Sequence, residues 1–534
     1  MNRCRPLLLS GSLRVYLYVL MIFGCSTLPL HAQLAATPKF ASKLQKAIVE
    51  LTAYDRQGQV LKTGTAFYVG NEGEALADYS LLRDSYKAIV TDATGKQSEV
   101  DCILGADDVY SMVRFRVKTT GNAVLPVSTS AVPVGHAVYA LPFTKQKSKV
   151  TPSASVIQST PVGEQYSFYT LSADLGNSAV GAPVFNDVGE LVGILQPATQ
   201  GRSSVMDIRY RSELKLTAFM STATSVALDG IHISKGLPDT KEEALVYTYF
   251  KSQTADNAEY AELIDRFVQA YPDNPEGYYR RATLRADLQQ YDEAEADLQQ
   301  YESLSENKET AGVYAATLRA QILTIRGETA QALAVYDRLC ADGHSSPGIL
   351  YAISTLREAR GDTLPQVIAP LDTAIASFGT PLPREAASYV LRRGQILANA
   401  GKYREAVLDY NQYCYLVNNK VNAAFYYERS QIEVNGRMYQ QAYDDIISAV
   451  GAAPRDVRYR VEKAAICLRV NHIDECIEAC RQALELDPNQ PDAFRIMGYA
   501  QIQQGNIAAA RQSLLRAVEL GDPNAQTIMD AYLK

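Results

Sequence analysis

The second half of the chain repeats a pattern of small residues at a constant spacing. Ala442, Cys476 and Ala510 lie 34 residues apart, in a region rich in Ala, Leu, Tyr, Gln and Glu. A repeat of this length is one supersecondary unit that cannot bury its apolar face alone, so neighbouring units must stack. The spacing therefore predicts an extended all-α solenoid after Asp239.

The repeated segments resemble tetratricopeptide repeats, which are helix–turn–helix units of about 34 residues. The resemblance implies about eight units over residues 241–522, followed by a terminal capping helix at 523–534. The clearer units cover 276–306, 386–418, 422–454, 456–488 and 491–523, and the weaker ones cover 241–271, 312–340 and 347–378.

The first half of the chain has a different period. Between residues 40 and 216, short apolar runs such as 47–51, 65–69 and 191–195 alternate with turns rich in Gly, Asp and Asn. Frequent turns and period-two alternation predict an all-β barrel or sandwich. Residues 217–240 have mixed polarity and contain Gly230, Gly236 and Pro238, which predicts a linker.

Three motifs of this β region resemble trypsin-like serine proteases of the HtrA/Deg kind. Residues 64–69 read GTAFYV, Pro183 follows a Gly-Ala pair, and residues 189–194 read GELVGI. The resemblance implies a double β-barrel followed by the repeat solenoid. It also implies which positions would carry a catalytic triad.

In register with those motifs, the histidine, aspartate and serine positions of the triad fall on Ser80, Ser111 and Val180. Acyl transfer in this fold needs a hydroxyl nucleophile, an imidazole base and a carboxylate that orients the imidazole. A valine has no oxygen to attack a carbonyl. The resemblance therefore predicts a pseudoenzyme that keeps the protease scaffold without its chemistry.

Two alternatives stay open at this point. Ser178, in the run Gly176-Asn177-Ser178, could be the nucleophile of an active envelope endopeptidase, with His232 as the nearest histidine outside the β region. His136, which lies within the β region, is predicted to be a turn or strand-edge residue. Alternatively, the β region could serve only as a structural cap for the solenoid.

The N-terminus has the pattern of a secretory signal peptide over residues 1–33, with basic residues before the apolar run 15–23. Cys25 also fits a lipoprotein box, so a soluble and a lipid-anchored form are both open. Either form predicts export to the periplasm or outer membrane of a Gram-negative bacterium. A net charge of −7 gives no reason to expect nucleic-acid binding, and the sequence has no cofactor or zinc motif.

The repeat region is predicted to bind a protein or peptide on its concave surface. Arginine forks and amphipathic tyrosines suit peptide recognition. The candidates are Tyr279, Arg280, Arg281, Arg285, Arg392, Arg393, Tyr427 and Arg429. A separate cluster of Cys467, Cys476 and Cys480 is read first as core packing, with a disulfide or a metal site as alternatives.

Overall fold

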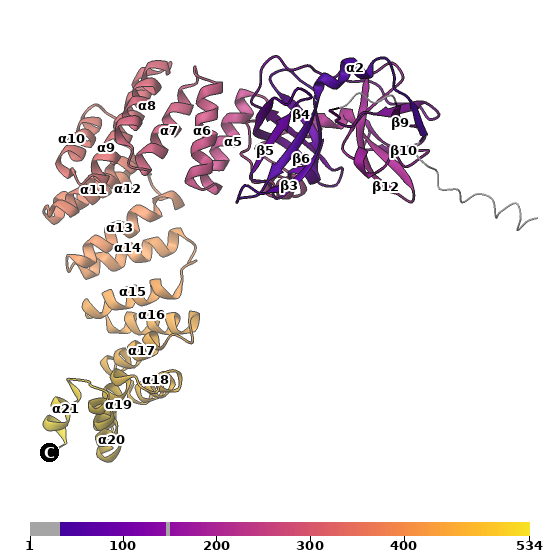
Figure 1. The fold of residues 1–534 in the computed structure, drawn as a ribbon. Helices are drawn as coiled ribbons and strands as arrows, with labels where there is room; N and C mark the ends of the chain where they lie inside the picture. The colour runs from indigo at the N-terminus through magenta and orange to yellow at the C-terminus, as the bar shows by residue number, and fades with distance from the viewer. Residues whose placement is uncertain (1–32, 146–149, 534) are drawn as a thin grey trace, which may run out of the picture. The chain divides into compact units, whose positions relative to one another are not determined.

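The computed structural model describes residues 33–145 and 150–533, so Cys25 and the predicted signal peptide, apart from Gln33, lie outside the described residues. The chain divides into two compact units, residues 1–306 and 307–534. The first unit contains two β-barrels and the first helices, and the second is built of helix pairs (Figure 1). The predicted fold class, a double β-barrel followed by an α-solenoid, is confirmed.

The first barrel is a closed antiparallel sheet of six strands in the order β2-β3-β4-β7-β6-β5. Strands β2, β5 and β7 alternate buried residues with more exposed ones over most of their length, and Phe67, Leu76 and Phe115 are buried. This is the period-two pattern of a barrel wall with one face in the core. The bounds are β2 Ile48–Tyr54, β3 Val60–Tyr68, β4 Glu74–Asp78, β5 Lys87–Thr91, β6 Gln97–Asp107 and β7 Met112–Val117.

The second barrel follows the order β8-β9-β10-β13-β12-β11, and pairing of β8 with both β9 and β11 closes it. Tyr169, Val184 and Leu195 lie in its core, and the short strand β1 (Gln33–Ala36) pairs with β9. The bounds are β8 Ala137–Ala140, β9 Val150–Val162, β10 Tyr166–Leu171, β11 Pro183–Phe185, β12 Leu191–Thr199 and β13 Arg202–Asp207.

Residues 217–240, which the sequence predicts as a linker, pack on the first barrel. Helix α4 (Thr222–Asp229) and the extended stretch after it pack on the first barrel, where Leu228, Ile231 and Ile233 join the core. The Ile103 N–H donates to the Ser234 carbonyl at 2.9 Å, and the Gly236 N–H donates to the Ile103 carbonyl at 2.8 Å. The two isoleucines alternate with polar residues, so the segment buries one side as an added strand would.

Four helices complete the first unit: α5 (Lys241–Thr254), α6 (Asn257–Ala270), α7 (Pro275–Asp287) and α8 (Tyr291–Leu304). Arg266 of α6 makes a bidentate ion pair with Asp101 of β6, with Nη1 to Oδ2 at 2.7 Å and Nη2 to Oδ1 at 3.2 Å. Both side chains are half-buried. The first helices are therefore fastened to the barrel by a charge-assisted contact.

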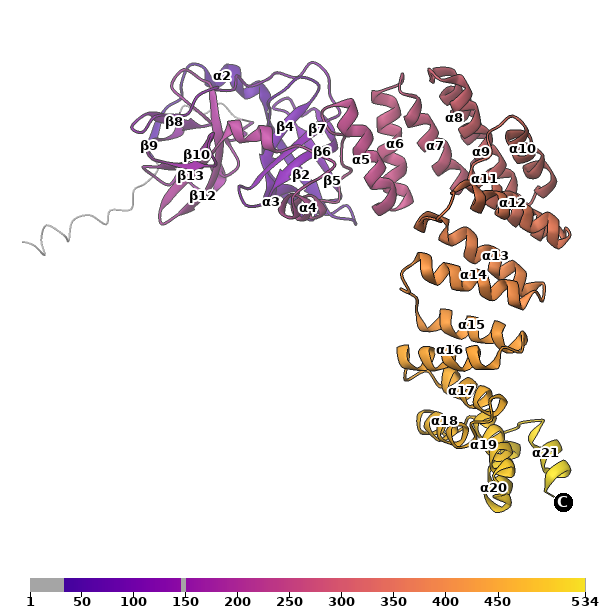
Figure 2. The same cartoon turned by 180° about the vertical axis from the view of Figure 1, so that it is seen from behind.

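The second unit consists of successive helix pairs and a final short helix. Small residues allow the two helices of a pair to approach closely: a Cβ added to Gly394 would lie 3.1 Å from the Tyr410 ring, and one added to Gly498 would lie 2.7 Å from Leu514. In Figure 2, α15 and α16 lie side by side as one such pair.

The helices of the second unit are α9 Lys308–Ile325, α10 Thr329–Ala341, α11 Pro347–Arg360, α12 Leu364–Ser377, α13 Ala387–Asn399, α14 Tyr403–Leu416, α15 Ala423–Asn435, α16 Tyr439–Ala452, α17 Val457–Arg469, α18 Ile473–Leu486, α19 Pro491–Gln503, α20 Ile507–Glu519 and α21 Ala525–Tyr532. Among the described residues, none of the helices combines the length and apolar character that a membrane crossing requires.

Candidate functional site

The segments that hold the predicted triad positions Ser80, Ser111 and Val180 meet at one buried carboxylate, that of Asp78. Asp78 is the last residue of β4 and is 2% exposed. Its Oδ1 accepts the Ser80 N–H at 2.9 Å, and its Oδ2 accepts the Ser111 hydroxyl at 3.0 Å. A Cβ added to Gly181, the residue after Val180, would lie 3.2 Å from the Asp78 Cβ. Segments far apart in the sequence thus meet at this carboxylate.

Local structure explains how each segment reaches Asp78. Asp78 caps the one-turn helix α3 (Tyr79–Leu82), which holds Ser80. Asp is a preferred N-cap because its carboxylate accepts the free N–H groups of the first turn. Ser111 precedes β7 with φ +50, and its carbonyl accepts the Tyr79 N–H at 3.2 Å. Our sequence reading missed Asp78, although an Asp two residues before Ser80 is an N-cap signal.

The loop at Val180 uses its own N–H groups. Asn177–Ala179 form one 3-10 turn, η2, in which Ser178 is exposed and Ala179 is buried. The Val180 N–H donates to the Asn177 carbonyl at 3.3 Å, and the Ala179 N–H donates to the Gly176 carbonyl at 3.0 Å. An oxyanion hole needs backbone N–H groups that are free to face the developing negative charge. The N–H groups of Ala179 and Val180 are engaged within the turn instead.

The two described histidines of the first unit, His136 and His232, lie elsewhere. The His232 ring stacks on Tyr86, with a centroid distance of 4.3 Å, and His136 is exposed in a turn. Within residues 33–145 and 150–533, no hydrogen bond joins a histidine to Ser80, Ser111 or Ser178. The structure therefore does not bring His232 and Ser178 together as a nucleophile–base pair.

A recurring ion pair crosses the helix pairs of both units. Arg281, Arg393 and Arg429 each bind a carboxylate sixteen residues later through Nε and Nη2, and the carboxylates are those of Asp297, Asp409 and Asp445. All three aspartates are buried. A buried carboxylate must be paired or protonated, and a bidentate arginine satisfies both of its oxygens. These arginines hold the two helices of a pair together.

The other predicted groove residues also have partners within the chain. Arg285 shares the Asp297 carboxylate, Arg280 pairs with Glu276 at 2.8 Å, and Arg392 pairs with Glu358. The Tyr279 ring packs on Tyr301 and the Tyr427 ring on Tyr459, both at 5.0 Å between centroids. Apart from Glu276, which lies on the same helix as Arg280, these partners lie on other helices, where the sequence alone does not reveal them.

One cavity of the second unit does retain unused donors. It has a volume of about 350 Å³ and lies among α13, α14 and α15. Arg392 Nε and Gln431 Nε2 line it, are buried, and have no hydrogen-bond acceptor among the described residues. Gln395 lies on α13 at the position that corresponds to Gln431 on α15, 36 residues earlier. Buried donors without acceptors are costly, so the cavity suits a ligand that supplies carbonyl or carboxylate oxygens.

The three clustered cysteines lie in a core. Cys467, Cys476 and Cys480 are buried between α17, α18 and α19, together with Ile477 and Ile496. They are free thiols, and burial raises the pKa of Cys467 to about 12. No group of three or more metal-ligating side chains occurs in the part of the chain that the structure describes.

Comparison with known families agrees with this architecture. The trypsin-like peptidase domain family matches residues 64–194, and two tetratricopeptide repeat families match residues 275–308 and 468–525. The chain thus combines a trypsin-like peptidase domain with tetratricopeptide repeats. Asp78 lies within the residues that match the peptidase family, and the Arg281–Asp297 bridge lies within a repeat match.

A relative among curated proteins is the Anti-sigma-I factor RsgI9 of Acetivibrio thermocellus, which is 28% identical over 165 residues. The match covers 30% of this chain and 23% of that protein. The chain therefore spans less than a quarter of the length of this relative, and the similarity concerns one part of each protein.

Proposed function

We propose that this chain is an exported pseudoprotease whose helical repeats bind a protein or peptide partner in the cell envelope. The observation that carries the proposal is the convergence of Ser80, Ser111 and Gly181 on Asp78. These contacts support the alignment that places Ser80, Ser111 and Val180 at the triad positions. The scaffold of a trypsin-like site is present, and the imidazole and the hydroxyl nucleophile are replaced.

The chemistry of the residues at Asp78 supports inactivity. A serine hydroxyl becomes nucleophilic only when a neighbouring base takes its proton, and a carboxylate next to a serine is a poor substitute for an imidazole. Both oxygens of Asp78 already accept hydrogen bonds from Ser80 and Ser111. Ser178 is exposed on a turn that uses the neighbouring N–H groups.

A fluorophosphonate probe tests the proposed inactivity directly. We expect no labelling of the full-length chain, because no serine is activated, while trypsin in a parallel reaction is labelled fully. Labelling of the chain that disappears in a Ser178→Ala variant would refute the pseudoprotease proposal and favour the active endopeptidase.

The repeat region supplies the binding function in this proposal. Tetratricopeptide repeats generally mediate protein–protein interaction, and an extended peptide offers regularly spaced backbone carbonyls. The unused donors Arg392 Nε and Gln431 Nε2 fit such acceptors, and Gln395 adds an amide on the neighbouring repeat.

Crosslinking from an envelope fraction tests this binding. The full-length chain should capture a defined partner, and a Gln395→Ala/Gln431→Ala variant should lose about ten-fold in affinity, because two side-chain hydrogen bonds contribute on the order of 1 to 2 kcal/mol together. A Gln503→Ala variant, changed at an exposed glutamine of α19, is the matched control. Unchanged capture by the double variant would exclude this cavity as the binding site.

Export is the remaining part of the proposal, and the N-terminal pattern of residues 1–33 supports it. The mass of the mature chain distinguishes the two forms. A lipid-modified N-terminal Cys25 indicates a membrane anchor, whereas cleavage near Ala32 indicates release as a soluble chain.

A further inference from the structure

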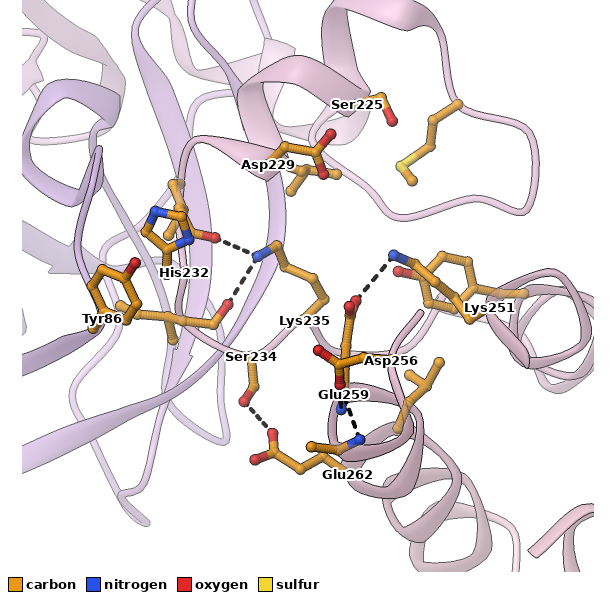
Figure 3. Close-up of a pocket in the computed structure, with 17 residues that line it drawn as sticks. Tyr86, Ser225, Asp229, His232, Ser234, Lys235, Lys251, Asp256, Glu259 and Glu262 are labelled. Atoms are coloured by element: carbon orange, nitrogen blue, oxygen red, sulfur yellow. Dashed lines mark hydrogen bonds and ion pairs between the residues drawn. The ribbon is translucent and has the colours of Figure 1, made fainter. Parts of the chain in front are cut away.

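The first unit contains a cavity that is separate from the Asp78 site. It has a volume of about 460 Å³ and lies between α4, the stretch 231–235, α5 and α6 (Figure 3). Tyr86 and His232 line it with their stacked rings, and Lys235 lines it from the stretch after α4. A volume of this size is typical of small-molecule pockets.

Lys235 is held in an unusual way for a lysine. Its Nζ donates to the Ile231 carbonyl at 2.5 Å and to the Ile233 carbonyl at 3.0 Å. Within the described residues, Lys235 forms no ion pair with a carboxylate. A neutral amine has two protons and one lone pair. Two carbonyl acceptors therefore satisfy both protons of the neutral form, and the lone pair is left for an electrophile in the cavity.

Most of the charged side chains near Lys235 interact with other partners. Lys251 pairs with Glu259 at 3.0 Å, Glu262 accepts the Ser234 hydroxyl, and Asp256 caps α6 by accepting two backbone N–H groups. The ionisable groups that line the cavity with Lys235 are Tyr86, Asp229, His232, Tyr247, Lys251, Asp256, Glu259 and Glu262.

Burial is the largest influence on the amine. Burial and the charge of Lys251 lower the pKa of Lys235, the charges of Glu259 and Asp229 raise it, and together they bring it to about 8. A buried lysine that is partly neutral near physiological pH is the kind that forms Schiff bases.

We propose that Lys235 is a nucleophilic amine that binds small aldehydes covalently as imines in this cavity. The neutral amine attacks the aldehyde carbon, a C–N bond forms, and both amine protons leave with the carbonyl oxygen as water. The product is a C=N bond between Lys235 and the former aldehyde carbon. The reaction needs no oxidant or reductant, and it is independent of the triad positions at Asp78.

The backbone keeps the amine in place for this reaction. Ile103 and Lys235 form a parallel β-bridge, and the Ser234 carbonyl and Gly236 N–H both bond to Ile103. The lysine therefore projects from a segment that is fixed to the first barrel, and its two carbonyl acceptors come from the same segment. Such a fixed nucleophile loses little entropy when it reacts.

Reductive alkylation of the full-length chain tests the proposal. A limiting amount of butyraldehyde forms imines, which cyanoborohydride reduces and so traps. Peptide mass spectrometry then reports the extent of alkylation at each lysine. We expect Lys235 to react at least ten-fold faster than Lys251 at pH 7.5, because the neutral fraction of an amine falls about ten-fold for each pH unit below its pKa and burial lowers the pKa of Lys235 to about 8. Lys251 is the matched control, since it lines the same cavity but is paired with Glu259.

The pH dependence gives a second measurement on the same chain. The rate at Lys235 should level off above about pH 8, while the rates at exposed lysines continue to rise. A Lys235→Met variant should lose only this adduct. Reaction at Lys235 no faster than at Lys251, or a rate at Lys235 that rises in parallel with the exposed lysines, would overturn the proposal. Both outcomes are read from the unmodified sequence, so a folding defect of the variant does not affect them.

Discussion

At the scale of single residues, the surroundings of the Asp78 carboxylate restrict which residue can occupy position 181. Its carboxylate bonds to the N–H of Ser80 and the hydroxyl of Ser111, and Gly181 approaches it with φ +79. The close approach and the positive φ both favour a residue without a Cβ at position 181. The glycine next to Val180 therefore has a structural requirement that is independent of catalysis.

A Gly181→Ala substitution measures that requirement. We expect it to destabilise the first unit by about 1 to 3 kcal/mol from the positive φ, with a further cost because the new Cβ would lie 3.2 Å from the Asp78 Cβ. Gly58→Ala is the control, since Gly58 has φ +78 and nothing lies within 4 Å of its Cβ position. Calorimetric unfolding of the full-length chain gives both values. Equal destabilisation by the two variants would show that the close approach of Gly181 to Asp78 adds no cost of its own.

At the scale of elements, helix pairs are joined by buried charges as well as by small residues. In the pair α15–α16, three ionisable side chains come together. Arg429 binds Asp445 through two hydrogen bonds of 2.5 and 2.7 Å, and Glu433 lies one turn further along α15. Burial, followed by the charge of Asp445, raises the pKa of Glu433 to about 8, and Arg429 opposes the shift. Near neutral pH, Glu433 is therefore largely protonated in the folded repeat.

This raised pKa predicts a pH-dependent stability. Between about pH 4 and pH 8, the unfolded chain loses the Glu433 proton before the folded chain does, so the free energy of unfolding falls as the pH rises. A Glu433→Gln variant should remove this loss and be more stable than the wild type at pH 9, by an amount on the order of 2 kcal/mol. The advantage should vanish near pH 4.

Hydrogen exchange of the α15 and α16 amides in the full-length chain measures, at each pH, the difference in stability between the Glu433→Gln variant and the wild type. A Glu405→Gln variant, changed at an exposed carboxylate of α14, should show no such trend. An advantage of Glu433→Gln that is the same at pH 4 and pH 9 would contradict the raised pKa.

At the scale of the molecule, the β-barrels and helices α5 to α8 belong to one compact unit. Helix α4 and the segment after it contribute Leu228, Ile231 and Ile233 to the core of the first barrel, and Arg266 of α6 binds Asp101 of β6. The second unit begins at Asn307. The repeats are thus divided between the two units, and the boundary does not coincide with the end of the β region.

The sequence by itself indicated the two periods and the fold class, because these are patterns of neighbouring residues and spacings, and it predicted which positions replace the triad. Only the tertiary structure showed the partners of Asp78, the Arg–Asp bridges and the packed segment 217–240. A buried charge selects its partner by distance in space, and Asp78 and Ser111 are 33 residues apart in sequence. Arginines that seemed available on a helix surface in the sequence are therefore engaged in the folded chain. The reactivity proposed for Lys235 likewise depends on the tertiary structure, because burial lowers the pKa of its amine.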